Sequence, residues 1–408
     1  MIVVKEYLSA LPQSNDEDLV LLVDAWDVWF QLPIEVLLQR YDAINLRANE
    51  RIRNQIGAKR VREYGVAQTI VASTQKRCWP ADSADHVCYA VPQSPLPSDL
   101  YGDDTDQHIT TPEDDSFEYA RYRPRYINSG IIMGNVKDMR KLYEELLNIY
   151  DDNPDETSDQ AILARAFGDQ EYQRHVWADE HRPKISLRDV KYTHPHPMRR
   201  RPHLKKRSYQ YSLGLDYWSE LGVSTIFSDH DYDWIRFNDT ESIRQAWESH
   251  NVTNPQSQTL DKDIANARPP FTSRKLLTAN SKAVLQEVGE TAIATASNTW
   301  NEQPLFSNLW TGVTPAVIHH NAYRADLKKI REYRWPDLWL QAHARDLLKQ
   351  RLDEGEQSYD SPVHEVAKIP WGVYTDREGE EQLTWNNVCN AGMQKEVFRD
   401  DKGAFEYP

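Results

Sequence analysis

The sequence predicts an α/β fold, and three observations support that prediction. The run "DLVLLVDAWDVWF" at 18–30 has the continuous apolar character of a strand buried in a sheet. A clear amphipathic helical pattern lies at 136–152, directly after another apolar run. Strand-like and helix-like segments then alternate along most of the chain, and the strands look parallel, which is typical of α/β proteins.

The N-terminal elements are predicted in the order strand, helix, helix, strand. The strand at 18–30 carries acids where it emerges from the sheet. Pro33 opens a helix over 33–41, because proline is tolerated in the first helical turn. A basic stretch at 45–65 indicates a second helix, and "QTIVAST" at 68–74 indicates a second strand.

The middle of the chain is predicted to hold a long ordered loop followed by a strand and two helices. Residues 79–125 are rich in Pro, Asp and Ser, with a short acidic helix near 113–120. "YINSGIIMGN" at 126–135 indicates a strand with a glycine-bounded turn, before the helix at 136–152. Ser158 is the N-cap of a further helix.

Four regions are predicted along the chain. Residues 1–250 form the catalytic core, and 251–275 form a loose linker. Residues 276–352 return to the core with Trp-rich helices near 324–352, and 353–408 form a C-terminal extension.

Composition limits the function classes. The net charge of −15 argues against a general nucleic-acid binder and against DNA as a partner. No apolar run is long enough to span a membrane, and residues 1–13 do not have the pattern of a secretory signal. Cys78 and Cys88 could pair in an oxidising compartment, but reduced thiols in the cytoplasm are the favoured interpretation.

Two basic stretches oppose the acidic balance of the chain. "MRRRPHLKKR" at 198–207 is predicted to be a loop, because prolines lie within it and before it. The helix at 45–65 is also rich in arginine. Such clusters neutralise nucleic-acid phosphates, although a solvated loop and an ordinary surface helix would look the same. The residues of the first stretch that could bind such phosphates are Arg199, Arg200, Arg201, Lys205, Lys206 and Arg207.

Two groups of carboxylates are candidates for chemistry. Asp24 and Asp27 follow the first strand, where an α/β sheet opens its ligand crevice, and their spacing suits a hard divalent cation that bridges phosphates. Asp114, Asp115 and Glu118 form a DDxxE pattern whose acids face one way on a helical turn. Carboxylates without histidine or cysteine favour a guanidinium over zinc. Mg²⁺ and a solvated helix turn are the alternatives.

Several motifs recur here in the order seen in one family. Over most of its length the chain resembles the GT-A glycosyltransferases related to the glycosyltransferase domain of procollagen lysyl hydroxylases and their fungal relatives. The resemblance implies a GT-A-like, Rossmann-like mixed sheet flanked by helices, with a helical C-terminal region. The motifs that carry it are "VDAWD" at 23–27, "NSG" at 128–130, "SDQ" at 158–160 and "IHHN" at 318–321.

The GT-A resemblance also implies roles for individual residues. Asp24, Asp27 and His319 would hold Mn²⁺ and the diphosphate of a sugar nucleotide. Asn128, Asp159 and Gln160 would lie on the donor-sugar and acceptor side. Only 23 residues precede Asp24, so the unit that holds uridine is expected to be shortened, or the sequence starts late. A GT-A-like crevice without its uridine-binding unit suggests that the fold serves a function other than sugar transfer.

The DDxxE motif carries a second resemblance, to the fungal arginine-containing cyclodipeptide synthases. It implies an aminoacyltransferase of secondary metabolism that condenses arginine from arginyl-tRNA with a second aminoacyl group to a cyclo-Arg-Xaa diketopiperazine. The partners are then arginyl-tRNA and a second aminoacyl-tRNA, and the basic tract at 198–207 would be the tRNA-binding segment. No ATP or other cofactor is required, because the ester is already activated; Mg²⁺ or Mn²⁺ is the ion that the acids would accept.

The synthase interpretation assigns the remaining site residues. Backbone amides near Ser129 and Gly130 could stabilise the oxyanion. Two alternatives stay open, a Mn²⁺-dependent GT-A glycosyltransferase using a UDP-sugar and a non-catalytic binding protein on the same fold. The catalytic candidates are Asp114, Asp115, Glu118, Asp24 and Asp27, and the substrate-binding candidates are Asn128, Ser129, Asp159 and Gln160.

Overall fold

The structure, a computed structural model, describes residues 1–24, 26–81, 83–109, 117–152, 154–155, 158–179, 208–253, 255, 258–271, 299–322, 329–348, 372–375, 379–382 and 389–404. It divides into two compact units, each built from separate parts of the chain. The first unit comprises Met1–Asp233, Trp247–Ser257 and Ser307–Lys328. The second comprises Trp234–Ala246, Gln258–Phe306 and Lys329–Pro408.

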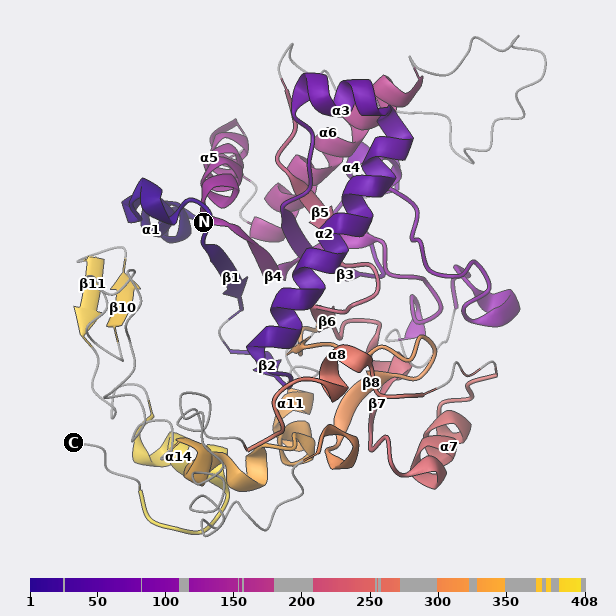
Figure 1. Cartoon of the computed structure of the whole chain (residues 1–408), viewed down its shortest axis with the longest axis vertical. Helices are drawn as coiled ribbons and strands as arrows, with labels where there is room; N and C mark the ends of the chain where they lie inside the picture. Colours follow the sequence, from indigo (N-terminus) through magenta and orange to yellow (C-terminus); the bar gives the residue numbers. More distant parts are fainter. Residues whose placement is uncertain are drawn as a thin grey trace. The chain divides into compact units, whose positions relative to one another are not determined.

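The elements keep the labels of Figure 1. The strands are β1 (Leu19–Val23), β2 (Val28–Phe30), β3 (Ile70–Gln75), β4 (Tyr126–Asn135), β5 (Leu213–Leu215), β6 (Gly222–Ser224), β7 (Tyr232–Ile235), β8 (Leu305–Asn308), β9 (Val317–His319), β10 (Gly372–Thr375) and β11 (Gly379–Gln382). The α-helices are α1 (Ile2–Ala10), α2 (Ile34–Ile56), α3 (Ala58–Tyr64), α4 (His86–Tyr89), α5 (Val136–Asp152), α6 (Asp159–Asp179), α7 (Thr240–Ser249), α8 (Lys262–Ala265), α11 (Ile330–Arg334) and α14 (Ala391–Phe398). Short 3₁₀ helices are η1 (Gln13–Asn15), η2 (Gly102–Asp104), η4 (Asp229–Asp231), η7 (Trp300–Glu302), η9 (Trp335–Asp337) and η10 (Gln341–His343).

Among the described residues, seven strands form one mixed sheet in the first unit. Its order is β1-β4-β3-β6-β9-β2, and β5 pairs with β3 beside this path. Strands β3, β5, β6 and β9 run parallel, whereas β4 is antiparallel to β1 and β3, and β2 is antiparallel to β9. The predicted α/β class with a mixed sheet is therefore confirmed, but its strands are not all parallel.

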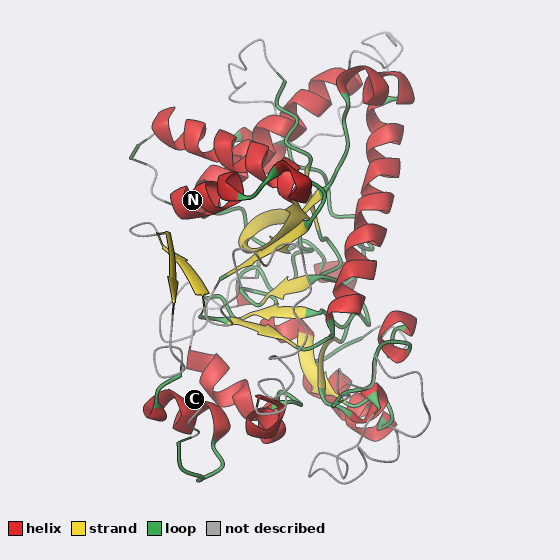
Figure 2. Ribbon diagram, turned by 60° about the vertical axis from the view of Figure 1, so that its left-hand side comes forward, coloured by secondary structure: helices red, strands yellow, loops and turns green. Residues whose placement is uncertain are grey.

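Helices flank this sheet (Figure 2). Helix α2 packs against β3, and α5 and α6 pack against β4, while α1 packs on α5. Apolar side chains of β3 and β4, including Ile70 and Ile132, meet Leu142 of α5 and Phe167 of α6 in the main core. Burial of these faces is the main force that holds the helices to the sheet.

The apolar run at 18–30 is two strands rather than one buried strand. The chain leaves the sheet after Val23 and re-enters at Val28, on the opposite edge of the sheet. Leu19 is exposed and the rest of β1 is half-buried, because β1 has a neighbour on one side only. The prediction of a single buried strand was therefore wrong.

The other elements of the first unit match the predictions more closely. The predicted helices at 33–41 and 45–65 are one helix, α2, followed by α3 after a break at Gly57, whose φ of 84° suits glycine. Strand β4 and helix α5 begin and end where predicted. Ser158 caps α6 through its Oγ, which accepts a hydrogen bond from the Ala161 amide (3.3 Å).

The long loop at 79–125 is ordered over the residues that the structure describes. It contains α4 and η2, and arginine side chains hold it to backbone carbonyls. Arg123 Nη1 donates to the Leu96 carbonyl, and Arg125 donates to the carbonyls of Pro92 and Val91. Of the acidic helix predicted near 113–120, residues 110–116 lie outside the described residues, and 117–120 form turns.

The compact units do not coincide with the four regions predicted from sequence. Strand β9 lies within the sheet of the first unit, so the chain around it belongs there, whereas 234–246 belongs to the second unit. Residues 258–271 were predicted to be a loose linker, but they contain α8, in which Ile264 is fully buried.

Several aromatic rings of the second unit pack against one another. Trp339 makes edge-to-face contacts with Trp300 and Phe271, at centroid distances of 5.3 and 5.2 Å. Trp335 Nε1 donates to the Val397 carbonyl (2.7 Å), which ties η9 to α14. The predicted Trp-rich helical region near 324–352 is thus built of short helical turns where the structure describes it.

Candidate functional site

Most of the described candidate residues lie at one end of the strands in the sheet of the first unit, the end where the parallel strands finish. The parallel strands β3, β6 and β9 and the outer strand β1 finish at this end, and the other outer strand, β2, begins there. Asp24 follows β1, Asp27 precedes β2, and His319 is the last residue of β9. The amide of Asp24 donates to the Gly130 carbonyl (3.1 Å), and the amide of His320 donates to the Asp27 carbonyl (2.7 Å). Both acids are therefore fixed by backbone pairing.

A bulge in β4 lies at the same end of the strands. Ala72 of β3 pairs with Ile132, but the next residue, Ser73, pairs with Asn128, so the intervening residues of β4 have no partner on β3. Bulges of this kind redirect a strand and are common beside active sites. Here the bulge brings Gly130 against the imidazole of His319, where a β-carbon would lie only 2.9 Å from Nε2. Glycine at 130 is what allows His319 to sit there.

Asp24, Asp27 and His319 form a compact cluster. His319 Nε2 lies 3.2 Å from Asp24 Oδ2 and 3.5 Å from Asp27 Oδ1. His319 and Asp27 are buried, whereas the side chain of Asp24 is 52% exposed and faces solvent. Burial alone would lower the pKa of His319, but hydrogen bonds with Asp24 and Asp27 raise it above the ordinary value.

The cluster also fits a divalent cation. One ligand atom from each residue lies within 4.8 Å of the other two. His319 Nδ1 lies 3.2 Å from Asn128 Oδ1, and this contact directs Nε2 toward the carboxylates, as the hydrogen-bond partner of a metal-bound histidine does. Two carboxylates and one imidazole suit Mn²⁺ or Mg²⁺. The structure thus brings together the three residues that the GT-A resemblance assigns to a metal.

The four predicted substrate-binding residues also lie together, but the backbone amides of Ser129 and Gly130 are already hydrogen-bonded. Gln160 Oε1 accepts from the Ser129 amide (2.7 Å), and Gln160 Nε2 donates to the Ile127 carbonyl (2.5 Å). The Gly130 amide donates to Asn128 Oδ1 (3.0 Å). The predicted oxyanion donors at 129 and 130 therefore already have acceptors, and this part of the prediction was wrong for the arrangement seen here.

A cavity of about 160 Å³ opens beside these residues. Asp24, Ser129 and Asp159 form its polar part, and apolar side chains of α1, β1, β4, α5 and α6 line the rest. Asp159 is the first residue of α6, and one of its oxygens accepts from the Gln160 amide (2.8 Å). The cavity thus connects two predicted site carboxylates from separate elements.

The DDxxE motif is only partly described. Asp114 and Asp115 lie outside the described residues, and Glu118 lies in the turn after them. Glu118 Oε1 is 3.5 Å from His108 Nε2. The adjacent Tyr119 packs against Phe227, which follows β6, and under the guanidinium of Arg77, which follows β3. The turn that carries Glu118 therefore lies at the same end of the parallel strands as the Asp24 cluster.

The structure describes only one of the two basic stretches predicted to bind phosphates. The tract Arg199, Arg200, Arg201, Lys205, Lys206 and Arg207 lies outside the described residues. In the second stretch, Arg51 lies over the ring of Tyr217, and Arg60 donates to the Trp177 carbonyl. These two cations are engaged within the protein, which weakens the case for that helix as a phosphate-binding surface.

A buried charged group was missed by the sequence analysis. Lys76, just after β3, is fully buried, and its Nζ lies 2.6 Å from Asp231 Oδ2 and 2.5 Å from the Ala120 carbonyl, to which it donates. Tyr101 OH donates to the same carboxylate (2.8 Å). Burial lowers the pKa of Lys76 despite its partner Asp231. This group ties the turn that carries Glu118 to the end of β3.

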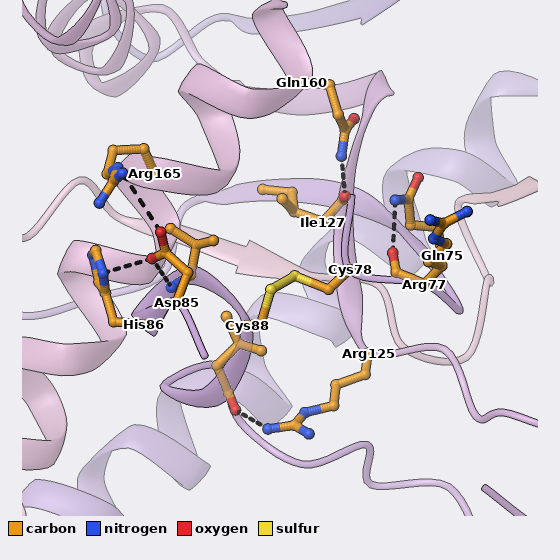
Figure 3. Close-up of a disulfide and its surroundings, with 12 residues drawn as sticks. Gln75, Arg77, Cys78, Asp85, His86, Cys88, Arg125, Ile127, Gln160 and Arg165 are labelled. Atoms are coloured by element: carbon orange, nitrogen blue, oxygen red, sulfur yellow. Dashed lines mark hydrogen bonds and ion pairs between the residues drawn. A yellow bond between two sulfur atoms is a disulfide. The ribbon is translucent and has the colours of Figure 1, made fainter. Parts of the chain in front are cut away.

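The structure pairs Cys78 with Cys88, so the favoured interpretation of two reduced thiols was wrong (Figure 3). Their Cα atoms are 5.8 Å apart, a separation that a disulfide spans. Beside the bridge, His86 of α4 lies between Asp85 (2.9 Å) and Asp169 (2.6 Å). The bridge thus fixes α4 to the segment that leaves β3 at the site.

Comparisons of the sequence with protein-family models and with curated proteins gave no match. Within the described residues, no helix combines the length and apolar character needed to cross a membrane.

Proposed function

We propose that this chain is an aminoacyl-tRNA-dependent cyclodipeptide synthase that works on a GT-A-like fold. It would condense arginine from arginyl-tRNA with a second aminoacyl group to a cyclo-Arg-Xaa diketopiperazine. The observation that carries the proposal is the position of Glu118. The turn that carries this acid of the DDxxE motif lies at the same end of the parallel strands as Asp24, Asp27 and His319.

The chemistry asks for carboxylates of two kinds. One set must bind the guanidinium of arginine, which paired carboxylates do through bidentate hydrogen bonds. Another must accept a proton from the α-ammonium group, because only the neutral amine attacks an ester. Glu118 and its two neighbours in the motif are assigned to the guanidinium. Asp24, whose side chain is half-exposed at the mouth of the cavity, is assigned to the proton.

The reaction then needs two acyl transfers. The amine of one aminoacyl group attacks the ester carbonyl of the other, a C–N bond forms, and the C–O bond to the tRNA ribose breaks. Asp24 takes the proton of the ammonium group and releases it to water before the second transfer. The proton that the attacking nitrogen loses as the amide forms passes to the ribose oxygen, which leaves as a hydroxyl. The second amine attacks the remaining ester in the same way and closes the ring. Both esters are activated, so ATP is not consumed.

A metal-dependent glycosyltransferase is the second candidate, and the cluster itself favours it. Asp24, Asp27 and His319 would hold Mn²⁺, and Asn128 would keep the histidine oriented. A bound Mn²⁺ would supply charge to stabilise the diphosphate leaving group of a UDP-sugar. The aminoacyl transfer needs no such ion.

One pair of assays separates the two candidates. Purified protein is mixed either with a pool of charged tRNAs or with UDP-sugars and Mn²⁺, and products are identified by mass. The Glu118→Gln variant should lose cyclodipeptide formation by about thirty- to a thousandfold, since it removes one charged contact. The matched control is Glu144→Gln, on the exposed face of α5, which should act as wild type. UDP release that EDTA abolishes, without any cyclodipeptide, would establish the second candidate instead.

A further inference from the structure

The cavity beside Asp24 has two chemically different parts. Its walls are largely apolar and include Val4 of α1, Leu22 of β1, Leu146 of α5 and Leu163 of α6. Of these four elements, β1, α5 and α6 pack against β4 and α1 packs on α5, so the walls are part of the folded core. An apolar cavity of this kind has no hydrogen bonds to offer a polar side chain inside it.

The polar part of the cavity carries negative charge. Asp24 and Asp159 both line it, together with Ser129. Both acids also act on the neighbouring Tyr143. Burial raises the pKa of Tyr143 most, and the negative charges of Asp159 and then Asp24 raise it further. A cationic group at this end would meet two carboxylates and a hydroxyl.

The size of the cavity limits what it can hold. Its volume is about 160 Å³. A protein cavity of about 150 Å³ holds one benzene molecule. A phenyl or isobutyl group would therefore fill it. A charged side chain would lose its hydration against the apolar walls and could find partners only at the end that Asp24 and Asp159 line.

We propose that this cavity takes the side chain of the second aminoacyl group, and that this amino acid is apolar, such as leucine or phenylalanine. Asp24 and Asp159 bind its α-ammonium group at the polar end, next to the ester that reacts. The inference rests on the proposed synthase function, because it assigns the second substrate of that reaction.

The test uses L-phenylalaninamide, which has the ammonium group and side chain of the substrate but cannot react as an ester. Its binding to the full chain is compared with that of glycinamide by calorimetry. Burial of the phenyl group should make phenylalaninamide bind about ten- to a hundredfold more tightly. The Val4→Phe variant fills the cavity and should abolish that difference, while Val3→Phe, half-buried on the same helix but not lining the cavity, should preserve it.

A second variant keeps the proposal testable if Val4→Phe fails to fold. Asp159→Asn changes an exposed side chain without changing its shape, and should weaken phenylalaninamide and glycinamide alike, because both carry the ammonium group. Equal binding of the two amides to the wild type, or unchanged preference in Val4→Phe, would overturn the proposal.

Failure of this inference and failure of the proposed function give different results. A cyclodipeptide whose second residue is charged would overturn the cavity assignment and leave the synthase function standing. Tight binding of phenylalaninamide that Val4→Phe abolishes, in a protein that makes no cyclodipeptide, would support the cavity assignment and remove the synthase function.

Discussion

Replacing Gly130 by alanine tests how the bulge in β4 supports the site. A β-carbon at this position would lie 2.9 Å from His319 Nε2 and closer still to Nδ1 and Cε1, so the imidazole must move. His319 would then lose its contacts with Asp24, Asp27 and Asn128. Overpacking of a well-packed interior costs about 1–3 kcal/mol. A displacement of about 1 Å at a reacting group can cost about a hundredfold in rate.

The matched control is Gly134→Ala, on the same strand but facing the core. Its β-carbon would lie 2.8 Å from Ile70 Cγ1 and 3.2 Å from Met139, away from the site. Urea unfolding should show a loss of about 1–3 kcal/mol for both variants, whereas only Gly130→Ala should lose product formation by about a hundredfold. Wild-type activity in Gly130→Ala would refute the view that the position of His319 matters.

Three further predictions concern other parts of the chain. Lys76→Met should lower the free energy of unfolding in urea by about 3–5 kcal/mol, because it leaves the buried Asp231 without its cation; a loss below about 1 kcal/mol would contradict this. The pKa of His86 is raised because its two aspartate partners outweigh burial, so its contribution to stability is complete below about pH 6.5 and is lost as pH rises through the raised pKa. His86→Asn should therefore narrow the stability difference between pH 6 and pH 8 in urea titrations, and an unchanged difference would exclude this role. Changing three of the six cations at 199–207 to glutamine should weaken every tRNA about equally and reduce the salt slope of binding by about one per contact, whereas selective loss of one tRNA would argue for base recognition.

Local patterns were enough to predict the elements whose boundaries depend on local chemistry. Helix α5 matches its prediction because its apolar stripe is regular. Helix α6 begins where predicted because Ser158 caps it, but it continues to Asp179, beyond the predicted stretch 158–168. The convergence of Asp24, Asp27 and His319 was predicted through family resemblance, since no local pattern links residues so far apart in the chain.

The features that the sequence did not predict depend on contacts between distant segments. The run at 18–30 looks like one strand, but Val23 pairs with β4 and Val28 with β9, on opposite edges of the sheet. Reduced thiols were predicted for Cys78 and Cys88 from the expected compartment, because nothing in the sequence between them shows that this loop brings the two cysteines together. A lysine at a strand end is usually solvated, so nothing marked Lys76 as buried.

The most direct test of the central claim is the mass of the product made from labelled arginyl-tRNA. Purified protein is given tRNA charged with carbon-13 arginine together with the remaining aminoacyl-tRNAs, in the presence of EDTA. The proposed function predicts a labelled cyclo-Arg-Xaa diketopiperazine that Glu118→Gln does not form and Glu144→Gln does. Absence of labelled cyclodipeptide, with transfer from a UDP-sugar once Mn²⁺ is restored, would contradict it.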